Sequence, residues 1–294
     1  MGKFYERLCR KLESHYMKTL KRRIKKILQV FGYFLVSKGK PDSPFNKTKG
    51  TKEGFLKLAL DASLQEYKEV KDYEDLTGFK VDEAWLNELA LHTQIVIKKS
   101  KLCYVHGRVI YSALSKYLST LNEQDKQGLT VIETGTARGF SSLCMAKALQ
   151  DNNSSGKVLT FDLISNQEKM FWNCIDDLEG KKTRLKLLDY WKDLVDKHLI
   201  FIEGDTRETL KSCSAGRVNF AFLDGAHTYK DVMFEFFQIK DKQIKGDVIV
   251  YDDYSPNIFP GIVEAVDHIC KDHGYERHDI SSEGERAYVI ATKQ

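Results

Sequence analysis

Residues 129–142 read LTVIETGTARGFSS, and this stretch decides the fold that the sequence predicts. An apolar run typical of a buried β-strand ends at Glu133, and the pattern of a helix begins after Gly139. Gly135 and Gly139 let the backbone between them turn tightly and approach a ligand closely. The first N–H groups of the following helix favour an anionic group such as a carboxylate. Strand, turn and helix together predict the first unit of an α/β domain, with a ligand site at the turn.

Further apolar runs follow this stretch and alternate with segments of helical pattern. The first five runs are continuous rather than alternating, which is typical of parallel strands covered on both faces. The last two favour an antiparallel hairpin at the C-terminal edge. The sequence therefore predicts an α/β fold with a doubly wound, seven-stranded, mostly parallel sheet. The expected strands are 129–133, 157–162, 199–203, 218–223, 247–251, 276–280 and 286–291.

The part of the chain before this sheet has a different pattern, and we divide the sequence into three regions. Residues 1–54 are a basic amphipathic helix and linker, 55–127 a helical lead-in or cap, and 128–294 the α/β domain. Apolar residues recur every three or four positions between Met17 and Leu35, with Lys and Arg on the opposite face. Such a helix could lie on an anionic membrane surface, or dock on its own domain or on a second subunit in a homodimer.

The lead-in shows three helical patterns, at 55–67, 82–98 and 107–121. Residues 38–54 between the basic segment and these helices have the polar composition of a weakly ordered linker.

Charge and cysteine usage exclude several classes of protein. The chain of 294 residues carries a net charge of +4, but residues 1–40 hold twelve Lys and Arg against two Glu, so the remainder is acidic. A positive charge confined to the extension argues against a nucleic-acid partner. The six cysteines are scattered without zinc-site or secreted-disulfide spacing. No apolar run approaches the roughly 20 residues of a membrane span. These features predict a cytoplasmic protein, with the basic helix as a candidate contact to the inner membrane face.

Polar residues at the ends of the second and third strands suit a nucleoside. Asp162 ends the second strand, where a carboxylate can accept hydrogen bonds from ribose hydroxyls. The alternative for Asp162 is a helix N-cap. Asp205 and Thr206 follow the third strand, beside the expected adenine position. The spacing E-x-G-x-x-x-G differs from the G-x-G-x-x-G of dinucleotide sites, which argues against an NAD-dependent oxidoreductase.

Acidic residues end the fourth and fifth strands, in 223-LDGAHTY-229 and 250-VYDDYS-255. A parallel sheet can bring Asp224, Asp252 and Asp253 together, and carboxylates that converge in one cleft suit a hard divalent cation, with Mg²⁺ the first candidate. The alternative is that Asp224 caps the next helix and that the other two are solvated loop charges.

The motif 133-ETGTARGFSS-142 resembles motif I of the class I S-adenosylmethionine (AdoMet)-dependent methyltransferases, in the form typical of catechol and caffeoyl-CoA O-methyltransferases. From Thr130 onward the chain also resembles the methyltransferase domain 24 family, which includes macrocin and sugar O-methyltransferases. The matching blocks are FDLI, FWNCIDDLEGKKTRLKLL, FIEGDT, FAFLDGAHTY and GDVIVYDDY. The resemblance implies a Rossmann-like sheet and AdoMet as cofactor. The residues that it places around AdoMet are Glu133, Gly135, Thr136, Gly139, Ser141, Asp162, Asp205 and Thr206.

The same resemblance implies a divalent cation on Asp224, Asp252 and Asp253, and an O-methyltransferase reaction with Asp224 and His227 as catalytic residues. His227 stands where the metal-dependent relatives have a lysine. We expect it to act as general base, because a neutral imidazole can remove a proton from a hydroxyl that a cation has acidified. The alternative is that His227 hydrogen-bonds a carboxylate that holds the metal.

The acceptor is implied by the resemblance alone: a small molecule or glycan, with the methyl group going to a sugar hydroxyl of a polysaccharide, a lipopolysaccharide or a glycosylated metabolite. Residues 92–111 and the tryptophans Trp172 and Trp191 are candidates to line its site, although core packing is the expected role of both tryptophans. Two other functions stay open from the sequence. One is a methyltransferase that needs no metal, and the other is a catalytically silent AdoMet-binding scaffold.

Overall fold

The computed structural model describes residues 45–281 and 287–294. The expected amphipathic helix between Met17 and Leu35 and the linker up to residue 44 lie outside the described residues, so its expected membrane and subunit contacts stay predictions. Among the helices in the described ranges, none is both long enough and apolar enough to cross a bilayer.

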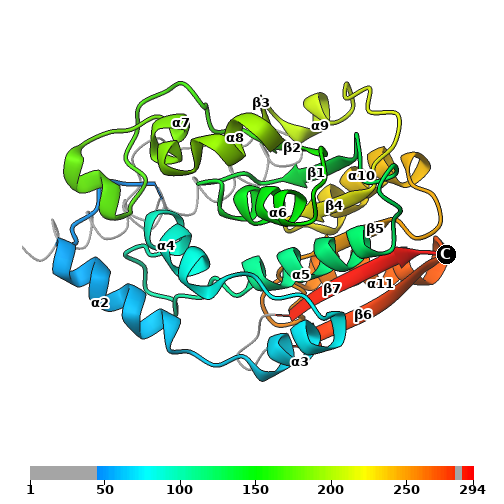
Figure 1. Ribbon diagram of the computed structural model, residues 1–294, viewed down its shortest axis with the longest axis horizontal. Helices are drawn as coiled ribbons and strands as arrows, with labels where there is room; N and C mark the ends of the chain where they lie inside the picture. The colour runs from blue at the N-terminus through cyan, green and yellow to red at the C-terminus, as the bar shows by residue number, and fades with distance from the viewer. Residues whose placement is uncertain (1–44, 282–286) are drawn as a thin grey trace, which may run out of the picture. The chain divides into compact units, whose positions relative to one another are not determined.

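Seven strands form one sheet with the order β3-β2-β1-β4-β5-β7-β6 (Figure 1). The first five strands are parallel to one another, and β7 runs antiparallel to both β5 and β6. This arrangement confirms the predicted fold, including the C-terminal hairpin. The strands are β1 (Thr130–Thr134), β2 (Lys157–Asp162), β3 (Leu199–Glu203), β4 (Phe220–Leu223), β5 (Val248–Tyr251), β6 (Tyr275–Ser281) and β7 (Ala287–Lys293).

The central strands are buried on both faces, which explains their continuous apolar sequences. In β5, Val248 and Val250 pack into the core that contains α5 and α6, whereas Ile249 and Tyr251 pack into the core that contains α10 and α11. In the view of Figure 1, α5 and α6 cover the near face of the sheet and α10 and α11 the far face. The helices are α2 (Lys52–Ser63), α3 (Lys68–Thr77), α4 (Glu83–Thr93), α5 (His106–Ser119), α6 (Phe140–Asp151), α7 (Arg184–Leu187), α8 (Lys192–His198), α9 (Thr206–Thr209), α10 (Tyr229–Ile239) and α11 (Pro260–Asp272).

The lead-in contains one helix more than the sequence predicts. Helices α2, α4 and α5 overlap the three predicted segments, although α2 begins at Lys52, inside the expected linker. Helix α3 was not expected, because its sequence KEVKDYEDLT is highly charged. Its buried side chains include Val70, Tyr73 and Thr77, which lie on one face at helical spacing. Gly78 ends α3 in the left-handed conformation (φ +78°), the usual way to close a helix.

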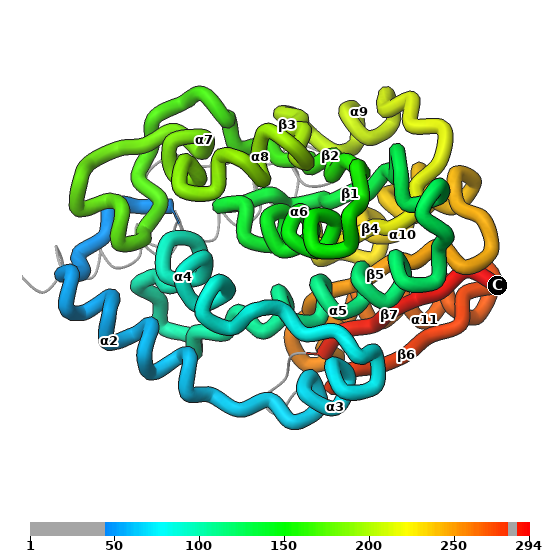
Figure 2. Tube along the Cα trace, viewed as in Figure 1, coloured from blue at the N-terminus to red at the C-terminus, as the bar shows by residue number. Residues whose placement is uncertain are grey.

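The segment between β2 and β3 folds as a long insertion that contains α7 and α8, and Figure 2 traces it along the backbone. Trp172 is completely buried and its indole N–H donates to the carbonyl of Lys182 (2.8 Å). Trp191 is also buried. Both tryptophans therefore serve packing, as expected. Phe45, near the start of the described chain, packs edge-on against Trp172 with ring centroids 5.8 Å apart.

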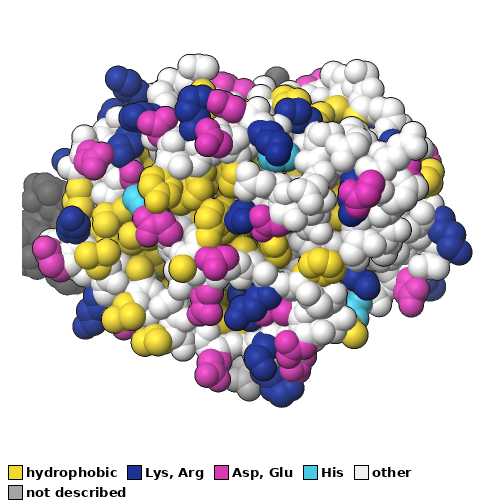
Figure 3. Space-filling model, in the orientation of Figure 1, with side chains coloured by type: hydrophobic (Ala, Val, Ile, Leu, Met, Phe, Trp, Pro, Cys, Tyr) yellow, Lys and Arg dark blue, Asp and Glu magenta, His cyan; other side chains and the backbone are white. Residues whose placement is uncertain are grey.

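Figure 3 shows hydrophobic side chains gathered over α2 and α4 on one face, with acidic and basic side chains interspersed. The exposed leucines of this region include Leu56 and Leu60 on α2 and Leu64 at its end.

Candidate active site

The register of the sheet brings the predicted site residues to one edge. Thr134 of β1 pairs with Leu223 of β4, and Leu223 pairs with Tyr251 of β5. The residue after each of these strands is Gly135, Asp224 or Asp252. Because parallel strands end at the same edge, the loops that begin with these three residues leave the sheet side by side.

The turn after β1 packs directly against the loop after β4. Gly135 has a φ of +91°, and a Cβ atom added to it would overlap the carbonyl oxygen of Asp224. Gly139 has a φ of +87°, and its Cβ would meet a Leu188 side-chain carbon at 2.7 Å. Both glycines do allow a tight turn, as predicted. A side chain at either position would, however, collide with another part of the protein rather than project into open space.

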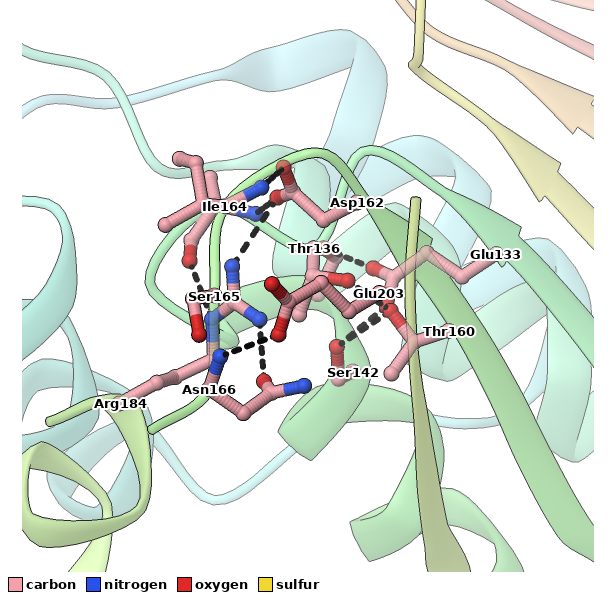
Figure 4. Close-up of polar contacts among 12 residues, drawn as sticks. Glu133, Thr136, Ser142, Thr160, Asp162, Ile164, Ser165, Asn166, Arg184 and Glu203 are labelled. Atoms are coloured by element: carbon pink, nitrogen blue, oxygen red, sulfur yellow. Dashed lines mark hydrogen bonds and ion pairs between the residues drawn. The ribbon is translucent and has the colours of Figure 1, made fainter. Parts of the chain in front are cut away.

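Glu133 is the centre of a buried hydroxyl cluster that fixes this turn (Figure 4). Its carboxylate accepts hydrogen bonds from the hydroxyls of Ser141, Ser142 and Thr160, the last at 2.5 Å. The hydroxyls of Thr136 and Thr160 are also bonded to each other (2.5 Å). Burial raises the pKa of the Glu133 carboxyl, and the donated hydrogen bonds oppose that rise. These side chains join β1, β2 and the start of α6, and contact with AdoMet by Glu133, Thr136 and Ser141 stays a prediction.

Asp162 lies at the end of β2, as predicted, and its carboxylate reaches back to the turn. It accepts the backbone N–H groups of Ala137 (2.6 Å) and Ile164 (2.8 Å), and it contacts the guanidinium of Arg184 (3.2 Å). Burial raises the pKa of this carboxyl, whereas Arg184 and the backbone donors lower it. No helix begins directly after Asp162, so the N-cap alternative is wrong. The Asp162 side chain keeps 12% of its surface exposed, and its contact with a ribose hydroxyl stays a prediction.

Asp205 and Thr206 lie at the end of the third strand, as predicted, but the Asp205 carboxylate already has partners. It accepts the Arg207 backbone N–H (2.9 Å) at the start of α9 and forms an ion pair with the Arg207 guanidinium (2.6 Å). The hydrogen bond from Arg207 lowers the pKa of Asp205. Contact of Asp205 and Thr206 with adenine stays a prediction.

Three titratable side chains converge at the ends of β4 and β5: Asp224, His227 and Asp253. One ligand atom of each lies within 4.8 Å of the others, which makes them a group able to hold a metal ion. The Nε2 atom of His227 is 3.8 Å from Asp224 Oδ1, and its Nδ1 atom is 3.6 Å from Asp253 Oδ2. Phe259 packs edge-on against the imidazole with centroids 4.4 Å apart. Two carboxylates and one imidazole are a donor set that fits a divalent cation.

Asp252, the third predicted metal ligand, is not a member of this group. Its Oδ1 atom accepts the backbone N–H of Asp253 (2.6 Å) and the side chain is buried. Asp253 itself adopts a φ of +55°, which is rare for a residue other than glycine. The structure therefore gathers Asp224, His227 and Asp253, rather than the three aspartates predicted.

The lead-in candidates for the acceptor site have partners inside the fold. His92 contacts Asp176 (2.6 Å) and the Tyr111 hydroxyl donates to Asp151 (2.8 Å). Arg108 forms an ion pair with the buried Glu74 and also lines a cavity of about 580 Å³ between α2, α3, α4 and α5.

Arg184 and Glu235 are among the buried charged residues near the site that the sequence did not predict. Arg184 lies in the insertion, among many other basic residues, and nothing in the local pattern marks it. Glu235 is different, because it is a lone carboxylate in the apolar run VMFEFF (232–237). A charge inside such a run is a signal that could have drawn attention to it.

Residues 132–254 match the family model described as "Methyltransferase domain". The match begins within β1 and ends shortly after β5, so it contains the glycine turn, Asp162 and the acidic group. With the strand order, it identifies this segment as a class I AdoMet-dependent methyltransferase domain, as predicted. No curated protein matches the sequence.

Several solved structures resemble the chain at low sequence identity. The O-methyltransferase NovP is 16% identical, with 67% of this chain and 83% of that chain covered and a TM-score of 0.49. An O-methyltransferase from Bacillus cereus in complex with SAH is 14% identical, with 81% and 96% covered and a TM-score of 0.46. The O-methyltransferase TomG from Streptomyces achromogenes, in complex with SAM, is 16% identical, with 73% and 92% covered and a TM-score of 0.47.

Proposed function

We propose that this protein, whose residues 132–254 form a methyltransferase domain, transfers the methyl group of AdoMet to an acceptor hydroxyl with the help of a divalent cation. The observation that carries the proposal is the contact between Gly135 and the carbonyl of Asp224. Through this contact the glycine turn, where AdoMet is expected, adjoins the loop of the Asp224–His227–Asp253 group. A cofactor in the turn and a cation in the group would flank one acceptor oxygen.

In this reaction the chain's own residues would hold AdoMet and the cation. Asp162, partly exposed at the end of β2, would accept hydrogen bonds from the ribose of AdoMet. Asp224 and Asp253 would hold the cation, because hard cations prefer carboxylate oxygens. When bound, such a cation supplies positive charge that lowers the pKa of a neighbouring hydroxyl.

His227 is the residue that we propose as proton acceptor. The acceptor oxygen bonds to the methyl carbon as the carbon–sulfur bond breaks, S-adenosylhomocysteine (AdoHcy) leaves, and the hydroxyl proton passes to the imidazole. Asp224 and Asp253 lie 3.8 and 3.6 Å from the imidazole nitrogens, so the imidazole adjoins the carboxylates that would hold the cation. The same geometry also suits His227 as a nitrogen ligand of the cation, the second role that this position supports.

The acceptor that we propose is a hydroxyl of a sugar, on a glycan or a glycosylated small molecule. Support comes from the resemblance of the sequence blocks to sugar O-methyltransferases. The test is transfer of labelled methyl from AdoMet to fractions of a cell lysate, with and without EDTA, followed by identification of the product. A labelled sugar formed only without EDTA supports both parts of the proposal. Labelling that EDTA leaves unchanged would show a metal-independent enzyme instead.

Binding measurements test the function independently of the acceptor. Calorimetric titration of the whole protein with AdoHcy should give a defined site, and NAD should give none. A His227→Ala variant should still bind AdoHcy but lose most turnover. If this variant kept full turnover, His227 would have no part in the reaction. If the wild-type protein bound neither AdoMet nor AdoHcy, the proposed function would be wrong.

A further inference from the structure

Arg184 is a buried cation next to the expected cofactor site. It is the first residue of α7, in the insertion after β2, and only 1% of its surface is exposed. Its guanidinium lies 5.8 Å from the ring centroid of Trp172 and 5.9 Å from that of Phe201. A charged group in such surroundings destabilises the fold unless its donors are satisfied. The polar partners of Arg184 should therefore indicate its role.

The polar partners of Arg184 lie in the glycine turn and at or just after the end of β2, and Figure 4 labels two of them, Asp162 and Asn166. Its Nε donates to the carbonyl of Ala137 (2.9 Å), its Nη2 to Asp162 (3.2 Å) and its Nη1 to the side-chain oxygen of Asn166. Asp162 in turn accepts the N–H of Ala137 (2.6 Å). Arg184 and Asp162 thus bind both backbone polar groups of the same residue.

Ala137 needs such support, because it has a φ of +46° in the middle of the turn. Residues other than glycine adopt this left-handed conformation only at an energetic cost. The cost is offset where surrounding contacts define the conformation, and such residues cluster at functional sites. Here the contacts of Arg184 and Asp162 with Ala137 hold the residue in this conformation.

We propose that Arg184 is a positioning residue for AdoMet: through its contacts with Asp162 and Ala137 it holds the Asp162 carboxylate toward the ribose hydroxyls and holds the turn in its binding conformation. This inference rests on the proposed function. It assigns the insertion after β2 a role in cofactor binding, since Arg184 reaches the turn from that segment. The carboxylates Glu133 and Glu203 also interact electrostatically with Arg184, so removing this cation would leave a cluster of negative charge around the site.

The experiment combines two changes in a thermodynamic cycle, using the whole protein and calorimetry. One change is Arg184→Gln, and the other is replacement of AdoHcy by its analogue without the 2′ and 3′ hydroxyls. In the wild-type protein, loss of the hydroxyls should weaken binding by roughly tenfold or more, because hydrogen bonds to a carboxylate are lost. Arg184→Gln should weaken AdoHcy binding by on the order of tenfold. In the Arg184→Gln protein, loss of the two hydroxyls should weaken binding by only about twofold further. Groups that act together give losses of affinity that do not add.

Two further variants separate positioning from folding. Arg184→Lys keeps the charge and should recover part of the lost affinity. Asn166→Ala removes one partner of Arg184 but leaves the cation, and should weaken AdoHcy binding roughly threefold without lowering the content of folded protein. The matched control is Arg217→Gln, which breaks an ion pair with the buried Asp247 (2.8 Å) before β5, at the opposite edge of the sheet. This control should bind both ligands like the wild-type protein.

The outcomes distinguish the inference from the function on which it rests. Equal affinity of the wild-type and Arg184→Gln proteins for AdoHcy would overturn the inference, and so would strictly additive losses in the cycle. If Arg184→Gln failed to fold, an unchanged affinity of Asn166→Ala would overturn it instead. A wild-type protein that bound neither ligand would refute the proposed function, whatever the variants did.

Discussion

Glu235 lies on α10 beneath the loop that carries Asp224, and it is almost completely buried. It accepts a hydrogen bond from the Thr134 hydroxyl (2.9 Å), and a Cβ atom on Gly225 would lie 2.7 Å from its Oε1. Burial raises the pKa of Glu235 to about 7, and the Thr134 hydroxyl only partly opposes this. The folded protein therefore binds a proton at Glu235 between about pH 4.5 and 7, where the unfolded chain has released it.

From this shift we predict that Glu235→Gln stabilises the protein at high pH. The stability that protonated Glu235 provides is fully present below about pH 4.5 and is lost as the pH rises through 7, a loss of about 3 kcal/mol. Urea unfolding should show the variant more stable than wild type by up to about that amount at pH 8, and equally stable near pH 4.5. The exposed Glu264→Gln on α11 is the control and should change little at any pH. A difference between Glu235→Gln and wild type that did not vary with pH would contradict the prediction.

A second prediction concerns which aspartates hold a cation. Asp253 contributes to the convergent group and Asp252 does not, so Asp253→Asn should reduce Mn²⁺ or Mg²⁺ affinity by more than about tenfold. Asp252→Asn should have a smaller effect, because it changes the bond to the Asp253 N–H (2.6 Å) but removes no member of the group. The rise in melting temperature with added metal measures the metal affinity of both variants. Equal losses of metal affinity in the two variants would contradict this prediction and support the three aspartates predicted from the sequence as ligands.

At the scale of elements, the contact between the β1 turn and the β4 loop can be tested with a pair of glycines. Gly135→Ala and Gly128→Ala both place a side chain at positive φ (+91° and +72°), but only the first meets other atoms. We predict a loss of about 1 kcal/mol in unfolding free energy for Gly128→Ala, from the backbone alone. Gly135→Ala should cost more than about 3 kcal/mol and abolish AdoHcy binding, because the new methyl group overlaps the Asp224 carbonyl. Urea unfolding and calorimetry give the two quantities. Similar values for both variants would mean that the close packing at Gly135 is unimportant.

The elements that the sequence predicts correctly are those whose own residues carry the signal. Strands such as β4 and β5 are short, continuous apolar runs, and burial on both faces explains that composition. Helix α3 was missed because only a few of its residues face the core and the rest are charged. The absence of Asp252 from the metal-binding group was missed for another reason. The neighbouring Asp253 has a positive φ, which nothing in the pair Asp-Asp indicates.

At the scale of the molecule, the site consists of contacts between segments far apart in sequence. The glycine turn and the strand ends were predictable, because a parallel sheet places all its carboxyl ends on one edge. The partners of those residues were not: Arg184 reaches Asp162 from the insertion, and Thr134 reaches Glu235 across a hundred residues. Sequence patterns report which face a residue takes within its own element. They do not report which side chain of another element it meets.

The contact between Gly135 and Asp224 also predicts that cofactor and cation affect each other's binding. A ligand that orders the glycine turn also orders the Asp224 loop packed on it, so the second ligand loses less conformational freedom when it binds. We expect saturating Mn²⁺ to raise AdoHcy affinity roughly fivefold, and saturating AdoHcy to raise Mn²⁺ affinity by the same factor, as linkage requires. AdoMet should gain less, because its sulfonium carries a positive charge that the cation repels and AdoHcy lacks. Calorimetric titrations in both orders measure these factors. If the metal left AdoHcy affinity unchanged, the glycine turn and the Asp224 loop would bind their ligands independently despite their contact. The contact would then contribute to stability alone.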